Sequence, residues 1–111
     1  MYKVDFYTLI DFGHGPEAHL VHGYGDGTKI LYYKTGGSSR CSWAAVHSDF
    51  GLAVCYGSTR AEVVRGSRDP GLLARVSAII DSPRGDEWRG RYTRLVAAAE
   101  LAACPELGRC N

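Results

Sequence analysis

Apolar and polar residues alternate along the first half of the chain, and the period of the pattern changes at about Gly57. Before that point apolar side chains recur at every second position, which is typical of β-strands with one buried face. After it they recur every three or four positions, which is typical of amphipathic helices. The pattern therefore predicts an α+β fold, with an antiparallel sheet of four or five strands followed by two or three helices.

The first half divides into short runs at its glycine-rich turns. Five runs predict strands: residues 2–10, 18–24, 29–34, 42–47 and 52–56. Gly25-Asp26-Gly27 joins the second and third runs, so these two form a hairpin. The last two runs predict a second hairpin, although the alanines at 44 and 45 make a helix over 43–47 the alternative.

The second half carries explicit helix start signals. Three runs predict helices: residues 59–66, 70–81 and 86–103, each within a residue or two. Thr59 and Glu62 have the spacing of a capping box, and Asp69 followed by Pro70 is an N-cap with proline in the first turn. The second helix has one apolar stripe, made of Leu72, Leu73, Val76, Ile79 and Ile80. Since 111 residues suit one domain, we expect residues 1–111 to form a single domain, with the last two helices covering one sheet face.

The composition is rich in the side chains that dominate protein interfaces. The chain has seven tyrosines and ten arginines, and Tyr and Arg are enriched at interface hot spots. Tyr32 and Tyr33 are neighbours in a strand and face opposite ways, so one is exposed or the sheet is covered on both sides. The candidate binding residues are Tyr33, Arg40, Arg89, Arg91 and Arg94.

One cluster of titratable residues could support metal binding or proton transfer. Three of the four histidines, His14, His19 and His22, fall within nine residues, together with Asp11 and Glu17. Imidazole and carboxylate groups can hold zinc or move protons. In a regular strand, however, His19 and His22 point to opposite faces, which weakens the site. His14, Glu17, His19 and His22 are the metal candidates, and we expect no bound cofactor.

The cysteines do not have the spacing of a zinc or redox motif. Cys41, Cys55, Cys104 and Cys110 contain no C-x-x-C pair. A disulfide between the first two or the last two is the alternative to free thiols. Cys41 lacks a suitably placed histidine base, which favours a small buried residue over a nucleophile. Because no signal peptide or membrane span is visible, we expect a cytoplasmic protein with reduced cysteines.

These observations leave three hypotheses about function. The first is a small binding protein that acts by protein–protein contact, such as the regulators and inhibitors that phages and mobile elements encode. The second is a metal- or histidine-dependent enzyme, which we favour less because no catalytic constellation is present. The third is binding of a nucleic-acid backbone through the helical arginines; a net charge of +1 and the lack of Gln disfavour it. An open sheet edge would also permit a homodimer.

Overall fold

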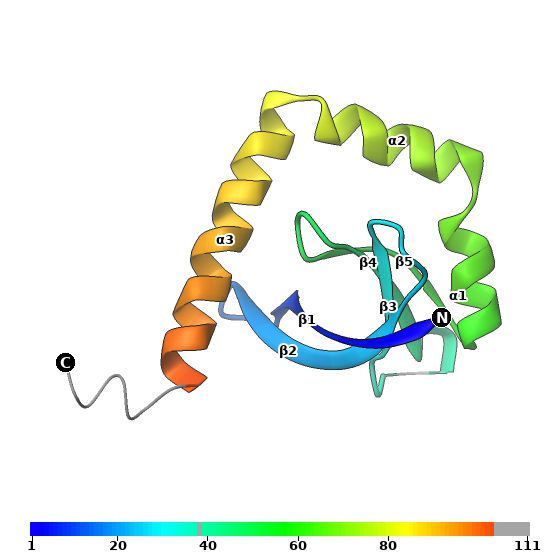
Figure 1. The fold of residues 1–111 in the computed structure, drawn as a ribbon, viewed down its shortest axis with the longest axis horizontal. Helices are drawn as coiled ribbons and strands as arrows, with labels where there is room; N and C mark the ends of the chain where they lie inside the picture. The colour runs from blue at the N-terminus through cyan, green and yellow to red at the C-terminus, as the bar shows by residue number, and fades with distance from the viewer. Residues whose placement is uncertain (38, 104–111) are drawn as a thin grey trace.

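The computed structural model describes residues 1–37 and 39–103, which form a five-stranded antiparallel sheet followed by three helices (Figure 1). The strands are β1 (Tyr2–Asp11), β2 (Pro16–Gly25), β3 (Ile30–Lys34), β4 (Trp43–His47) and β5 (Leu52–Gly57). The helices are α1 (Arg60–Ser67), α2 (Pro70–Ile80) and α3 (Pro83–Ala103), with a short 3-10 helix, η1 (Ser39–Cys41), before β4. Each strand pairs with the next in the chain. The α+β class and the order of the elements are confirmed, and the alternative helix over 43–47 is wrong.

Both faces of the sheet are covered, so Tyr32 and Tyr33 are both buried. Tyr33 lies on one face with Phe6, and the two rings meet edge to face with centroids 6.0 Å apart. Tyr32 lies on the other face beneath Val63 of α1. Its hydroxyl lies 2.7 Å from Ser67 Oγ, and both side chains are almost fully buried. Helix α1 is therefore the element that covers this second face.

The sheet curls until its first strand reaches the start of its last strand. The Leu9 N–H and the Thr8 hydroxyl both donate to the carbonyl oxygen of Gly51, at 2.8 Å and 3.0 Å. Figure 1 shows the bend as the long curve of β1 and β2. This curvature encloses the Phe6–Tyr33 cluster, whose described members all come from the strands. By strand order β1 and β5 are the two edge strands, and the curvature brings one end of β1 next to the start of β5.

The helix starts follow the capping signals in the sequence. Thr59 Oγ1 accepts a hydrogen bond from the Glu62 N–H at 3.1 Å, and the Asp69 carboxylate accepts one from the N–H of the third residue after it. Helix α3 begins at Pro83, earlier than the sequence suggested. Ser82-Pro83 is a start signal, since the Ser82 hydroxyl accepts from the Gly85 N–H at 3.4 Å.

The helices frame the sheet on three sides, and the last two do not cover one face as the sequence predicted (Figure 1). Helix α3 packs against β2, and Tyr92 Oη donates to the Tyr7 carbonyl oxygen at 2.7 Å. Helix α2 packs chiefly against α3. None of its residues is buried. The apolar stripe of α2 is therefore not part of the core.

Candidate binding groove

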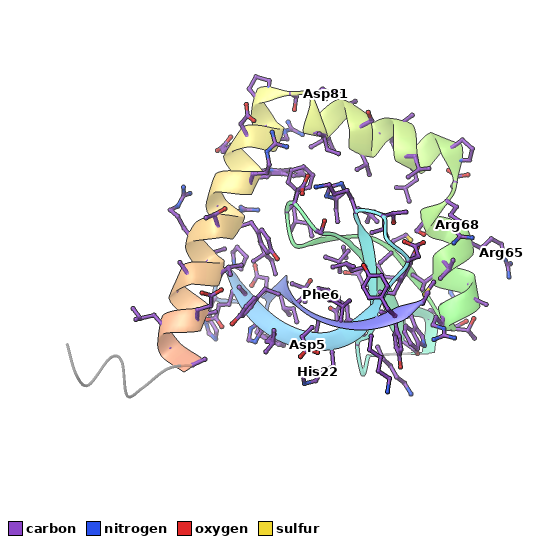
Figure 2. The ribbon with its side chains drawn as sticks, viewed as in Figure 1. Asp5, Phe6, His22, Arg65, Arg68 and Asp81 are labelled. Carbon is purple, nitrogen blue, oxygen red and sulfur yellow. The ribbon has the colours of Figure 1, made fainter. Side chains whose placement is uncertain are left out.

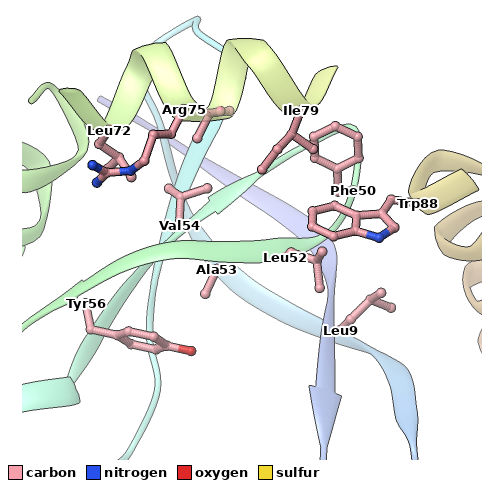
Figure 3. A pocket seen from close by; sticks show the side chains of 11 residues that line it. Leu9, Phe50, Leu52, Ala53, Val54, Tyr56, Leu72, Arg75, Ile79 and Trp88 are labelled. Atoms are coloured by element: carbon pink, nitrogen blue, oxygen red, sulfur yellow. The ribbon is translucent and has the colours of Figure 1, made fainter. Parts of the chain in front are cut away.

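An apolar groove of about 490 Å³ lies between α2 and β5 (Figure 3). Helix α2 contributes Leu72, Val76 and Ile79, which belong to the stripe recognised in the sequence. The opposite wall is β5, and Trp88 of α3 closes one end. The predicted stripe therefore faces an open space and not a sheet surface.

The position of α2 is fixed at both ends. At its start, Asp69 caps the helix and Pro70 occupies the first turn. At its end, Gly85 of α3 is buried against the last turn of α2, where a Cβ atom would lie 2.4 Å from the Ile79 carbonyl oxygen. That distance is closer than real Cβ contacts, so only glycine permits this approach of the two helices. The corner holds α2 away from β5 and keeps the groove open.

Phe50 and Trp88 line one end of the groove, and the buried His47 packs behind Phe50. Phe50 lies between His47 and Trp88, with ring centroids 4.9 Å and 5.9 Å away. Burial lowers the pKa of His47, which favours the neutral imidazole. Its Nδ1 accepts a hydrogen bond from the Asp49 N–H at 3.2 Å, which requires that nitrogen to be unprotonated. The β4–β5 turn is thus fixed against α3 by packing and by one neutral histidine.

The groove follows the edge of β5 and not one of its faces. Successive side chains of a strand point to opposite faces, yet Leu52, Ala53 and Val54 all line the space. In Figure 3, Val54 points towards α2, whereas Ala53 and Tyr56 point to the other side of the strand. The backbone edge of β5 therefore faces the groove.

Arg75 is the only charged side chain among the described residues that line the groove. It lies on α2, between Leu72 and Val76 in the sequence, and Figure 3 shows it beside Leu72. No ion pair within the part of the chain that the structure describes involves it. An apolar groove with one unpaired guanidinium suits an apolar ligand that carries a carboxylate.

The histidine cluster is dispersed over two faces of the sheet. His22 Nδ1 lies 2.7 Å from an Asp5 carboxylate oxygen, on the convex side of β1 and β2 (Figure 2). His19 Nε2 lies 3.4 Å from Glu17, without the alignment of a hydrogen bond, and its ring meets Phe12 edge to face. Of the predicted metal candidates, only Glu17 and His19 lie together, whereas His22 pairs with Asp5.

His14 is exposed in the turn between β1 and β2, and Asp11 shapes that turn. The Asp11 carboxylate accepts hydrogen bonds from the Gly13 and Gly15 N–H groups at 2.7 Å and 3.2 Å. Within residues 1–37 and 39–103, no group of three or more His, Cys, Asp or Glu side chains could hold a metal ion. The titratable side chains of this cluster therefore do not converge on one site in the described part of the chain.

The five candidate binding residues do not share one surface. Tyr33 is only 8% exposed and packs in the core, because the sheet curls over it, so it is not available to a partner. Arg40 is exposed in η1, and Arg94 is exposed on α3. Arg89 packs over the ring of Phe50. Arg91 is half-buried, and its Nε has no hydrogen-bond partner among residues 1–37 and 39–103.

The described cysteines are both free thiols. Cys41 is exposed, contrary to the buried position that we expected, and it is not bonded to Cys55. The Cys55 thiol is half-buried on β5, donates to the Val63 carbonyl oxygen at 3.7 Å, and has its pKa raised by burial. The predicted pairing of Cys104 with Cys110 lies outside the described residues.

No family model matches this sequence, and neither a curated protein nor a solved structure matches it. In the portion of the chain that the structure covers, no helix combines the length and apolar character needed to cross a membrane. The groove is therefore the feature of this protein that points to a function.

Proposed function

We propose that this protein binds another protein through the groove between α2 and β5, and that it acts by this contact as a regulator or inhibitor. One observation carries the proposal: α2 has an apolar stripe, yet none of its residues is buried. A helix of a globular domain normally packs such a stripe against its own core. Exposed apolar surface that is bordered by polar residues typically marks an interaction site.

The stripe could supply part of the free energy of a specific complex. Leu72, Val76 and Ile79 are already partly buried. Complete burial would therefore add at most about a third of the roughly 1.5–3 kcal/mol that a fully exposed side chain gains, or roughly 2–3 kcal/mol together. Micromolar binding corresponds to about 8 kcal/mol, and association and side-chain ordering oppose part of any gain. The apolar residues of β5 and Trp88 would have to add to the contribution of the stripe, so the expected affinity is modest.

The lining chemistry supports binding and not catalysis. Among the described residues that line the groove, Tyr56 and Arg75 are the only ones with titratable side chains. Neither a carboxylate nor an imidazole lies there to serve as a general base. A wall of aliphatic and aromatic side chains with one cation is typical of a recognition surface.

A matched pair of variants on α2 tests the proposal. Ile79→Glu places a charge in the groove, whereas Ala78→Glu places the same charge on an exposed neighbour that does not line it. We expect immobilised wild type and Ala78→Glu to retain the same partner from an extract of the source cells, and Ile79→Glu to lose it. Circular dichroism should show that all three proteins are folded. Equal capture by the two variants, or no specific capture by wild type, would contradict the proposal.

A further inference from the structure

We infer that the occupant of the groove is an extended segment of the partner, which adds to the open edge of β5 as a sixth strand and places a carboxylate against Arg75. This inference rests on the proposed binding function and specifies the chemistry of the partner. Three features carry it: the two edges of the sheet differ, the groove surrounds the edge of β5, and the groove holds one unpaired cation.

The edge of β1 is protected against pairing with another chain. Lys3 and Asp5 are exposed on this strand, and charged side chains on an edge strand oppose the addition of another strand. Two groups of its outer edge are already used: Tyr92 Oη donates to the Tyr7 carbonyl oxygen, and the Leu9 N–H donates to Gly51. A partner strand therefore finds charge and occupied hydrogen-bonding groups at β1.

The edge of β5 is less protected, although β1 bonds to the residue before it and α1 packs against the strand. The strand Leu52–Gly57 contains no charged residue. Within the described residues, its backbone makes hydrogen-bonded pairs only with β4. A strand edge with unpaired N–H and C=O groups is a template for an extended peptide. The sequence thus leaves open the one edge that the groove exposes.

The shape of the groove suits a strand. An added strand lies in the plane of the sheet, so its alternate side chains point to both sides of that plane. The groove has walls on both sides of the β5 edge, with Val54 on the side of α2 and Ala53 on the other (Figure 3). Val54 is also the extra residue of a bulge, because Ala45 pairs with Cys55 and the next residue of β4 pairs with Ala53. Bulges are frequent beside functional sites.

The charges on α2 disfavour a second copy of this chain as the occupant. Asp69 and Asp81 lie at equal separations on either side of Arg75. A two-fold contact centred on the groove face of α2 would bring Arg75 towards its own copy and Asp69 towards the copy of Asp81. Such juxtapositions of like charge weaken an interface. A different chain with an aspartate or glutamate opposite Arg75 complements the surface, and its extended form uses the β5 edge.

The inference can be tested with peptides of known sequence. A random peptide library is selected on the immobilised 111-residue chain, with counter-selection on Ile79→Glu to remove peptides that bind elsewhere. The recovered peptides are synthesised with backbone N-methyl groups at alternate residues, in two registers. A methyl group on one edge of a strand blocks its hydrogen bonds with β5, whereas the other register leaves that edge intact.

We expect the recovered peptides to be apolar with one acidic residue, and N-methylation in one register alone to weaken binding by more than about tenfold. Arg75→Glu should weaken the acidic peptide by about tenfold, and a lysine at the acidic position should restore binding to that variant. The outward amides of β5 should exchange more slowly with solvent in the complex. These three results together would establish strand addition.

Other outcomes overturn the inference in distinguishable ways. Peptides that compete for the groove but weaken equally in both methylation registers, and become helical on binding, would refute the sixth strand while supporting the binding function. A wild-type dimer that Ile79→Glu dissociates would show that a second copy occupies the groove. The absence of any peptide that distinguishes wild type from Ile79→Glu would count against both the inference and the function on which it rests.

Discussion

The same substitution at two helical valines tests whether α2 lies outside the core. Val63 of α1 is 0% exposed and packs under the sheet with Tyr32. Val76 of α2 is only partly buried and lines the groove. Replacement of each by alanine removes the same atoms from a helix interior, so the difference between the two variants reports only the surroundings.

The expected magnitudes follow from burial. Val63→Ala loses two buried methyl groups, about 1.6 kcal/mol at 0.8 kcal/mol each, and the cavity brings the total to about 2–3 kcal/mol. The greater helix propensity of alanine returns roughly 0.5 kcal/mol at both sites. Val63→Ala should therefore destabilise the protein by about 2 kcal/mol. Val76 keeps part of its surface in water and its removal leaves no enclosed cavity, so Val76→Ala should cost only about 0.5–1 kcal/mol.

Urea unfolding followed by circular dichroism measures both values, provided that the m-value is unchanged between variants. Wild type and the two variants are compared at the same temperature and protein concentration. A loss of about 2 kcal/mol for Val76→Ala would refute the argument, because the stripe of α2 would then be buried and the groove closed. A small loss for Val63→Ala would instead place α1 away from the sheet in solution.

Three further expectations concern the buried polar pair, the neutral histidine and the helix corner. Tyr32→Phe and Ser67→Ala should each cost about 1–3 kcal/mol, and the double variant should cost about 1 kcal/mol less than their sum in urea unfolding. Burial lowers the folded-state pKa of His47, so the unfolded chain takes up the proton first as the pH falls. The free energy of unfolding should therefore decrease below about pH 6.5. His47→Asn should reduce this dependence of the unfolding free energy on pH. Gly85→Ala should lower the free energy of unfolding by about 1–3 kcal/mol and abolish groove binding. Gly90→Ala on the same helix should be neutral or stabilising by up to about 1 kcal/mol. Thermal unfolding measures the stability of both variants, and peptide titration measures their binding.

Local sequence signals accounted for the elements of the fold but not for what covers the sheet. The period of two, the glycine-rich turns and the caps at Thr59 and Asp69 act within a few residues, so they can be recognised without tertiary structure. The covering of Tyr32 and Tyr33 depends on the curvature of the sheet and on the path of α1, which no local pattern records. The early start of α3 was missed because Ser82-Pro83 can either end one helix or begin the next.

The groove was not predicted, although its residues were noticed. The stripe of α2 was recognised and assigned to packing on the sheet, since periodicity identifies an apolar face but not the surface opposite it. The lack of charge in β5 is a signal that could have indicated an open edge, but only when compared with Lys3 and Asp5 on β1. The closeness of the histidines in sequence suggests a shared site. Neighbouring strand positions of opposite parity, such as His19 and His22, lie on opposite faces of the sheet, so closeness in sequence does not bring them together.

The open stripe of α2 is best understood as a consequence of how the helices are connected. Leu72, Val76 and Ile79 are only partly buried, and complete packing of α2 on β5 would gain roughly 2–3 kcal/mol more, a sizeable share of the stability of a small domain. The corner at Gly85 holds the helix away from that position, because the carbonyl oxygen of Ile79 lies where a Cβ atom would be. The apolar stripe of α2 thus stays incompletely buried because the Gly85 corner holds the helix in place. The stripe therefore remains available for contact with another molecule.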